Sequence, residues 1–383
     1  MLYRSVGQTG KQASILGFGC MRLPIRQGKA HLIDEARAQA MVDCAIRNGI
    51  NYFDTAYVYH SEIPFQAGTS ELFLGRALKH QRAKVFVATK LPTWLVQSRT
   101  DMDRYLNLQL DRLQTDHIDF YLVHSLTGGL WTKLSQLDVR GFLDAALADG
   151  RIRHAGFSFH DDGPQFKPIV DAYDWAFCQI QYNFMDEDYQ AGRAGLDYAA
   201  GKGLGVIVME PLRGGGLATR VPEEVQTCWD SAPVKRRPAA WALRFVWNHP
   251  GVSVVLSGMS EPWQLEENLR TAEEGLPNSL SAAELRLVQE ARNSFLARTQ
   301  IHCTSCNYCM PCPSGVSIPD NFEQYNNLAV YRDRDAAAFY YFHILGPEQR
   351  ASHCTECGHC LELCPQHIPI PERLKDVTRE FEG

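Results

Sequence analysis

The sequence reads Ile118-Asp119-Phe120-Tyr121-Leu122-Val123 about a third of the way along its 383 residues. This run contains β-branched and aromatic residues without strict polar alternation, which predicts a strand buried on both faces of a parallel sheet. Seven other runs share this character: residues 15–19, 50–54, 85–89, 152–158, 175–181, 204–209 and 252–257. We therefore expect eight parallel strands.

Amphipathic helical patterns alternate with these strand-like runs, and the clearest lie at residues 35–47, 71–78, 101–113 and 142–148. Repeated strand–helix units over about 300 residues are typical of an α/β fold and predict a (β/α)8 TIM barrel. A doubly wound open sheet is the alternative, because periodicity alone does not separate the two. Turn residues Gly7 and Gly10 indicate an N-terminal hairpin that would plug the lower end of a barrel.

The composition is that of a globular protein, with 45% hydrophobic residues, 21% charged residues and a formal net charge of -6. This mildly acidic balance gives no electrostatic reason to expect nucleic acid or an anionic membrane as a partner. No apolar run approaches the ~20 residues that a membrane-spanning helix needs, and residues 1–10 contain no signal-peptide segment. We expect a cytoplasmic protein whose cysteines do not form disulfides.

Eight of the twelve cysteines fall in two closely spaced runs near the C-terminus. The runs are Cys303-x2-Cys306-x2-Cys309-x2-Cys312-Pro313 and Cys354-x2-Cys357-x2-Cys360-x3-Cys364-Pro365. Three thiolates at every third residue can bind three corners of a 4Fe-4S cluster, and the cysteine before proline binds the other cluster in two-cluster ferredoxins. This rule predicts two clusters, one held by Cys303, Cys306, Cys309 and Cys364, the other by Cys354, Cys357, Cys360 and Cys312. The last step of the first run is one residue shorter than the usual pattern.

Structural zinc is the alternative, since zinc is also bound by sets of four cysteines. Zinc ribbons use pairs of C-x2-C and rarely add a third cysteine in step before a Cys-Pro, so the spacing favours iron–sulfur clusters. Haem attachment is excluded because C-x-x-C-H does not occur. The other cysteines are scattered singly and are interpreted as small buried residues: Cys20, Cys44, Cys178 and Cys228.

The pattern of the sequence changes near residue 281. Ser281-Ala282-Ala283-Glu284 is a capping box that begins a helix. Residues 319–346, between the cysteine runs, have a polar and aromatic helical pattern that is unlike the compact hairpin type of ferredoxin. We predict two domains, a barrel over residues 1–295 and an α-helical ferredoxin-like domain over residues 296–383.

Four polar residues lie at or just beyond the ends of strand-like runs, where barrel enzymes build their active sites: Asp54, Tyr59, Lys90 and His124. A tyrosine with its ordinary pKa near ~10 is a weak acid, and a neighbouring ammonium lowers that pKa. An aspartate can hold the lysine, and a histidine can donate a hydrogen bond to a carbonyl. Each residue taken singly also fits a cap, a turn or a solvated side chain, but together they are the parts of a carbonyl reductase.

The segments that contain these residues resemble those of the aldo/keto reductase superfamily: Asp54-Thr55-Ala56-x-x-Tyr59, Ala88-Thr89-Lys90 and Asp119-Phe120-Tyr121-Leu122-Val123-His124. The resemblance covers roughly residues 3–275 and includes residues 17–22 and 70–78. With Cys309-Met310-Pro311-Cys312-Pro313, the whole chain is similar to the branch that carries a C-terminal dicluster domain. The family fold is a (β/α)8 barrel, so the resemblance favours the barrel over the open sheet.

The resemblance also implies a role for individual residues. Tyr59 would be the general acid, Lys90 the residue that lowers its pKa, Asp54 the partner of Lys90, and His124 the residue that orients the carbonyl. A nicotinamide cofactor, NAD(H) or NADP(H), would be bound by Ser158 and Gln181 at its carboxamide, by Gly214, Gly215 and Gly216 at its pyrophosphate, and by Asn268 at its adenine. A plain flexible loop would also contain such a glycine run.

The sequence departs from the family pattern around the expected cofactor. Phe159 stands where the family commonly has a carboxamide-binding Asn, and Met209 where it has an aromatic residue that stacks on the nicotinamide. Gly258 and Gln264 stand where the family has the Lys and Arg of its adenosine-phosphate site. Because a 2′-phosphate without a cationic partner is poorly held, the resemblance does not extend to a preference for NADPH.

Three functions are therefore in competition. The first is an oxidoreductase that interconverts a small carbonyl compound and an alcohol, with the clusters transferring electrons. Hydride chemistry moves two electrons and a cluster moves one, so a flavin would normally mediate, yet no flavin motif is visible. The second is a ferredoxin-linked redox protein, flavin-assisted or not, whose barrel does not turn over free NAD(P)H. The third is a non-catalytic cluster scaffold. It predicts that some of the four polar residues at the strand ends would be replaced, but all four are present.

Overall fold

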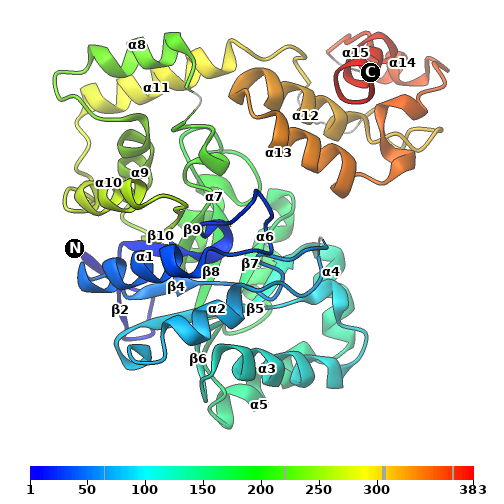
Figure 1. Ribbon diagram of the computed structural model, residues 1–383. Helices are drawn as coiled ribbons and strands as arrows, with labels where there is room; N and C mark the ends of the chain where they lie inside the picture. The colour runs from blue at the N-terminus through cyan, green and yellow to red at the C-terminus, as the bar shows by residue number, and fades with distance from the viewer. Residues whose placement is uncertain (64, 220, 304–307, 365) are drawn as a thin grey trace. The chain divides into compact units, whose positions relative to one another are not determined.

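The structure is a computed structural model that describes residues 1–63, 65–219, 221–303, 308–364 and 366–383. The chain divides into two units (Figure 1). The first unit comprises Met1–Leu212 and Ala239–Leu285, and the second comprises Arg213–Pro238 and Arg286–Gly383. These units are defined by compactness, and the predicted domain limits, residues 1–295 and 296–383, stay a prediction from the sequence.

The first unit is built on a closed barrel of eight parallel strands, in the order β10-β3-β4-β5-β6-β7-β8-β9. The strands are β3 (Leu16–Gly19), β4 (Tyr52–Asp54), β5 (Phe86–Leu91), β6 (Ile118–Leu126), β7 (Ile152–Phe159), β8 (Phe177–Gln181), β9 (Gly205–Met209) and β10 (Val252–Gly258). Because β10 pairs with both β3 and β9, the sheet has no free edge. The predicted barrel is confirmed, and the open sheet is excluded.

Two strands extend two or more residues further than the sequence pattern predicts. In β5, Lys90 and Leu91 still pair with Leu122 and Val123 of β6, and β6 itself continues to Leu126. Lys90 and His124 therefore stand inside strands and not in the loops after them. The apolar runs end earlier than the strands because the last residues of both strands include polar side chains, Lys90 in β5 and His124 in β6.

Helices follow the strands around the barrel (Figure 1). They are α1 (Glu35–Arg47), α2 (Ser70–Ala77), α3 (Arg99–Leu113), α4 (Gly128–Gln136), α5 (Val139–Ala148), α6 (Gly163–Asp171), α7 (Gly192–Gly201), α9 (Pro238–Asn248) and α10 (Pro262–Ala272). Helix α1 shows why such a segment is helical, since the Asp34 side chain accepts a hydrogen bond from Arg37 N at its start and Met41 and Val42 lie on its buried face.

The predicted hairpin is present as β1 (Tyr3–Ser5) and β2 (Gln12–Ser14), which pair antiparallel. Its residues Val6 and Ala13 are fully buried in one apolar cluster with side chains of the barrel strands, among them Phe120. Gly7 has φ +49, and a Cβ there would lie 2.3 Å from the backbone nitrogen of Gly205, the first residue of β9. The hairpin thus closes the amino-terminal end of the barrel, and the carboxyl end is left for a site.

The second unit is helical. Its helices are α8 (Glu223–Ser231), α11 (Ala282–Leu296), α12 (Ile318–Tyr331), α13 (Arg334–Phe339), α14 (His359–Leu363) and α15 (Ile370–Glu382). The predicted capping box begins α11, with Ser281 N bonded to Glu284 Oε2 (2.8 Å) and Glu284 N to Ser281 Oγ (3.2 Å). Phe322 of α12 and Leu374 of α15 belong to the buried apolar core of this unit.

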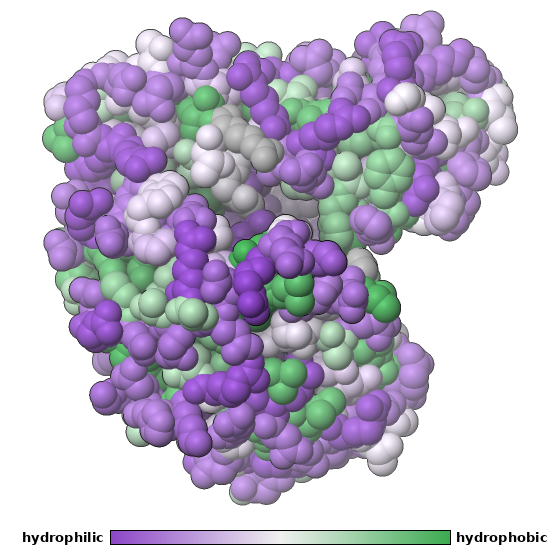
Figure 2. Space-filling view, viewed as in Figure 1, coloured by the Kyte–Doolittle hydropathy of each residue, from purple (hydrophilic) through white to green (hydrophobic). Residues whose placement is uncertain are grey.

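No helix among the described residues is long and apolar enough to cross a membrane. Figure 2 shows polar side chains over most of the viewed face, with apolar side chains in separate patches. The large apolar side chains are mostly in the interior, as the fully buried Trp229, Trp241 and Trp247 illustrate.

Candidate functional site

Three of the four polar residues predicted to act together meet around one ammonium group. Lys90 Nζ donates to Asp54 Oδ1 (2.8 Å), to Asp54 Oδ2 (2.7 Å) and to the backbone oxygen of Thr55 (2.8 Å), and it lies 3.3 Å from the hydroxyl of Tyr59. Asp54 ends β4, Lys90 is near the end of β5, and Tyr59 stands in the loop that follows β4. Parallel pairing of β4 with β5 places the two strand ends side by side at the carboxyl end of the barrel.

The charge of Lys90 is well stabilised in this position. Its side chain is 0% exposed, and that of Asp54 is 3% exposed. Burial by itself lowers the pKa of Lys90, but the opposite charge of Asp54 and the Tyr59 hydroxyl raise that pKa above its ordinary value. Lys90 is therefore an ammonium at neutral pH, although it is out of contact with water.

Tyr59 is a phenol at neutral pH. Burial raises its pKa to about 12, and the charge of Lys90 acts in the opposite direction without outweighing burial. The lysine thus keeps the pKa below the value that burial would otherwise impose, but not below the ordinary value near ~10. A protonated hydroxyl beside a fixed ammonium can donate its proton to an oxygen that becomes negative.

His124 completes the group from β6. Its ring centre lies 6.4 Å from that of Tyr59 and 5.2 Å from that of Trp94. Burial, with smaller contributions from Lys90 and His160, lowers the pKa of His124 well below its ordinary value, so the ring is neutral. Its Nδ1 is buried and has no hydrogen-bond partner among the described residues. A neutral imidazole keeps one N–H, which can donate a hydrogen bond to an oxygen.

A buried network behind Lys90 was not predicted from the sequence. Glu71 is 0% exposed and accepts hydrogen bonds from Thr89 (2.6 Å), Gln109 (2.7 Å) and Arg112 (2.8 Å). Gln109 Nε2 also donates to the backbone oxygen of Lys90 (3.0 Å). Glu71 therefore joins α2, α3 and β5 and holds the strand that carries Lys90. The sequence signal that could have revealed this network is Ser70-Glu71. The pair lies within the resemblance to the family, but no role was assigned to it.

The residues predicted to hold a nicotinamide stand at the carboxyl ends of neighbouring strands. Ser158 near the end of β7 accepts a hydrogen bond from Ser125 N (2.7 Å), and Gln181 at the end of β8 donates to Asp186 (2.7 Å). Both side chains are at most 9% exposed. The Ser158 hydroxyl proton and the Gln181 amide oxygen are the groups that would face a carboxamide, so this donor and acceptor pair fits one.

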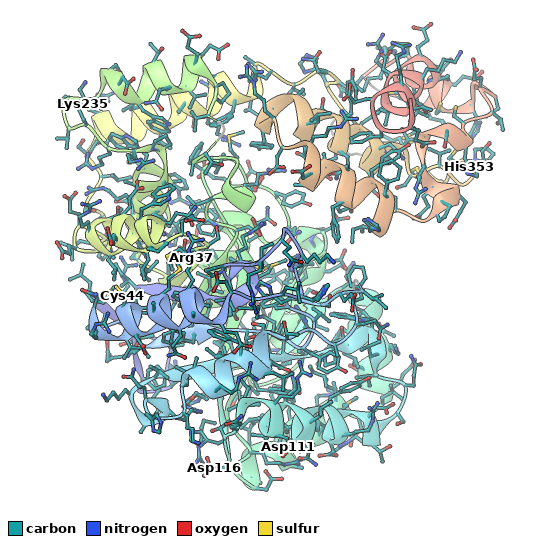
Figure 3. All side chains as sticks on the ribbon, viewed as in Figure 1. Arg37, Cys44, Asp111, Asp116, Lys235 and His353 are labelled. Carbon is teal, nitrogen blue, oxygen red and sulfur yellow. The ribbon has the colours of Figure 1, made fainter. Side chains whose placement is uncertain are left out.

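Gln264, which stands where the family has a charged residue of its adenosine-phosphate site, has a structural role at the start of α10. Gln264 Oε1 accepts from the backbone nitrogens of Ser260 (2.8 Å) and Glu261 (3.1 Å), so Gln264 caps the helix. Arg37 of α1, labelled in Figure 3, forms an ion pair with Glu261. Asn268 Nδ2 donates to Ser257 Oγ (3.0 Å).

The glycine run belongs to the second unit. Gly214 has φ +64 and Gly215 has φ +101, conformations that only glycine adopts without strain. Arg213 precedes the run, and its Nη2 donates to Asn327 of α12 (3.1 Å) while its guanidinium lies 4.5 Å from the ring of Tyr331. The loop is thus attached to a helix between the two cysteine runs.

Five cysteines line one pocket of the second unit: Cys309, Cys312, Cys354, Cys357 and Cys360. Four of these are the set predicted for the second cluster. Apolar side chains of Ile318 and Leu374 line the same pocket. Burial, followed by the neighbouring thiolates, raises the pKa of Cys360. Soft thiolates around an apolar pocket fit a 4Fe-4S cluster.

The set predicted for the first cluster is described in part. Cys309 is buried in the core of the second unit, and Cys303 and Cys364 pack against that core. Cys306 lies outside the described residues. Within the described ranges, no three His, Cys, Asp or Glu side chains converge closely enough to hold a single metal ion.

Comparison with known proteins identifies both parts of the chain. The model of the aldo/keto reductase family matches residues 15–289, and that of the 4Fe-4S dicluster domain matches residues 302–368. The chain is 27% identical to L-galactose dehydrogenase of Arabidopsis thaliana, in an alignment that covers 71% of this chain and 88% of that protein. It is 26% identical to protein tas of Escherichia coli, in an alignment that covers 71% of this chain and 93% of that protein. Aldo-keto reductase AKR11C1 from Bacillus halodurans superposes with a TM-score of 0.62 at 27% identity, over 76% of this chain and 96% of that one.

Proposed function

Because the chain belongs to the aldo/keto reductase family and carries a 4Fe-4S dicluster domain, it is an iron–sulfur-containing oxidoreductase, and we propose that its barrel interconverts a small carbonyl compound and an alcohol with a nicotinamide cofactor. The proposal depends above all on one observation. The Tyr59 hydroxyl lies 3.3 Å from a fully buried Lys90 ammonium that Asp54 holds with two hydrogen bonds.

Each of the four residues has a role in carbonyl reduction. The Tyr59 hydroxyl donates its proton to the carbonyl oxygen as that oxygen becomes negative. Lys90 stabilises the resulting phenolate, and Asp54 keeps the ammonium in place. His124, as a neutral ring, donates a hydrogen bond that orients the carbonyl. In alcohol oxidation Tyr59 must first lose its proton, and the phenolate, stabilised by Lys90, then accepts the proton of the alcohol.

The cofactor, when bound, supplies or accepts the hydride. Ser158 and Gln181 hold its carboxamide in this proposal, and Gly214, Gly215 and Gly216 offer backbone nitrogens to its pyrophosphate. Asn268 is the residue assigned to the adenine. Gln264 is occupied as a helix cap and brings no charge, so the proposal includes no preference for NADPH and leaves the choice between NAD(H) and NADP(H) open.

Two 4Fe-4S clusters, when bound, would supply or accept electrons one at a time. Cys303, Cys306, Cys309 and Cys364 would hold one cluster, and four of the five thiols that line the pocket would hold the other: Cys312, Cys354, Cys357 and Cys360. A ferredoxin or another redox protein would be the partner that donates or accepts these electrons.

A second function is favoured by the cofactor departures. Phe159, Met209 and the capping role of Gln264 each remove a contact that the family makes to the cofactor. In this alternative the barrel does not turn over free NAD(P)H, and the protein receives electrons from a ferredoxin. Anaerobic titration of the clusters with NADH, NADPH and reduced ferredoxin separates the two functions. The alternative is favoured if reduced ferredoxin, but neither NADH nor NADPH, bleaches the visible absorbance of the clusters and no NAD(P)H-dependent carbonyl reduction is detected.

The reductase proposal is tested by replacing Tyr59 with Phe and assaying an aldehyde and aldose panel that includes L-galactose. We expect at least a hundredfold loss of kcat, within the range that removal of a general acid gives. Tyr57→Phe is the matched control, because Tyr57 lies in the same loop and packs its ring on Tyr105. Retention of full activity by Tyr59→Phe contradicts the role of Tyr59.

A further inference from the structure

His60, the residue directly after Tyr59, joins two loops at the carboxyl end of the barrel. It is 7% exposed, and each of its ring nitrogens has a backbone partner. The backbone nitrogen of Leu23 lies 3.1 Å from His60 Nε2, and the backbone oxygen of Ala30 lies 2.6 Å from His60 Nδ1. His60 therefore connects the loop of residues 23–33, which follows β3, to the segment after β4 that is described over residues 55–63 and 65–69.

These partners determine the tautomer of the ring. A backbone N–H only donates, so Nε2 of His60 must accept from Leu23 and carries no proton. A carbonyl oxygen only accepts, so Nδ1 must carry the proton that it donates to Ala30. The imidazole is thus neutral. Of its possible forms, only the tautomer with the proton on Nδ1 makes both hydrogen bonds.

The backbone of His60 is unusual as well. Its φ is +61, in the left-handed region that a β-carbon disfavours and that glycine adopts freely. Glycine would relieve this conformation but would supply neither hydrogen bond. A non-glycine residue kept in such a conformation beside a site suggests that its side chain has a function there.

Tyr59 is held on both sides of its peptide. The backbone nitrogen of Ser70 donates to the Tyr59 oxygen (3.2 Å), and a Cβ on Gly68 would lie 1.9 Å from that same oxygen. Thr69 adds a second tie between the loops, since its Oγ1 donates to the oxygen of His31 (3.2 Å) and its nitrogen to that of His60 (3.1 Å). The turn that presents Tyr59 is therefore bonded through its backbone to Thr69 and Ser70, and it contains the residue whose ring contacts the loop of residues 23–33.

We infer that His60 is a positioning residue for Tyr59. Its neutral ring clasps the loop of residues 23–33 onto the turn and so keeps the Tyr59 hydroxyl beside Lys90. The effect on kcat presupposes the proposed reaction, whereas the contact between the two loops does not depend on it. Loss of the clasp lowers kcat because the hydroxyl samples more positions, while the groups assigned to the cofactor are unchanged.

The test compares His60→Gly, His60→Asn and His60→Gln with the wild-type holoprotein. His60→Gly accepts the positive φ without strain and removes both hydrogen bonds, so we expect kcat to fall about tenfold, or about 1.4 kcal/mol in the activation barrier, with the dissociation constant of the nicotinamide cofactor unchanged. Asn can replace Nδ1 as the donor to Ala30, and Gln can place an acceptor near the position of Nε2. Each should recover part of kcat.

Gln27→Gly is the matched control, because Gln27 also has a positive φ (+56), lies in the clasped loop and is exposed. We expect it to leave kcat unchanged. A kcat for His60→Gly within twofold of wild type overturns the inference, and so does an equal loss in Gln27→Gly.

Hydrogen exchange separates this inference from the proposed reaction. In His60→Gly, amides of residues 23–33 should exchange faster than in wild type, whether or not the protein reduces any carbonyl compound. Faster exchange with an inactive wild type supports the clasp and contradicts the proposed reaction. Unchanged exchange in residues 23–33 overturns the clasp irrespective of activity.

Discussion

Lys90 Nζ donates to both carboxylate oxygens of Asp54, at 2.8 and 2.7 Å, and the two side chains are 0% and 3% exposed. Two charges removed from water in this way are tolerated because each compensates the other. The pair therefore has a structural role as well as the catalytic role proposed for it, and the two roles can be measured separately.

Removal of one member of this pair should destabilise the barrel strongly. Lys90→Met leaves the Asp54 carboxylate buried without a partner, which costs about 3–5 kcal/mol. The double variant Lys90→Met/Asp54→Leu removes both charges and should recover a large part of that loss. Urea unfolding of the single and double variants checks this. Equal stability of the two would show that the remaining carboxylate is solvated or protonated.

Tyr59 should remain protonated throughout the neutral range in the free protein. Burial raises its pKa to about 12, against the opposing charge of Lys90. We expect the difference in 295-nm absorbance between wild type and Tyr59→Phe to stay flat from about pH 7 to about pH 10, the ordinary pKa of a tyrosine. A tyrosinate signal near about pH 8 would mean that Lys90 outweighs burial.

His124 should make the barrel less stable in mild acid. Burial, then Lys90 and His160, lowers the pKa of His124 well below its ordinary value of 6.5. The unfolded chain therefore binds a proton at His124 that the folded chain does not, so the free energy of unfolding falls as the pH decreases below about 6.5. His124→Gln lacks this titration and should lose less stability than wild type between about pH 7 and about pH 5. Parallel urea midpoints for the two proteins across this range would contradict the prediction.

One cysteine of the pocket should account for half of the iron. Two 4Fe-4S clusters bring about eight irons per chain, so Cys360→Ser should retain about four after anaerobic purification. Cys228→Ser is the control, because the Cys228 thiol hydrogen-bonds to the backbone oxygen of Leu287 (3.4 Å) and belongs to neither run. Iron and acid-labile sulfide analysis checks both variants. A full iron content in Cys360→Ser would remove this cysteine from the proposed ligands.

Much of the fold was predictable because it depends on local pattern. The runs at 118–123 and 152–158 correspond to β6 and β7, and α1 spans the predicted residues 35–47. The pattern failed at strand ends, where Lys90 and His124 are polar residues within strands. Lys90 is kept in its strand by ladder pairing with Leu122, whereas His124 lies at an irregularity of β6 between Val123 and Leu126, and single-residue propensity reports neither feature.

The sequence by itself determined the alternation of strands and helices and the spacing of the thiols, because hydrophobic periodicity and fixed ligand spacing are written in neighbouring residues. The barrel was favoured over an open sheet only by the resemblance of the motifs to one family, and the pairing of β10 with β3 in the structure closes it. Only the tertiary structure decided which polar groups satisfy one another. Glu71 bonds to Thr89, Gln109 and Arg112, and His60 bonds to Leu23 and Ala30, across separations that no sequence period encodes. The physical reason is that a buried polar group must find a partner wherever the closed barrel brings one within reach.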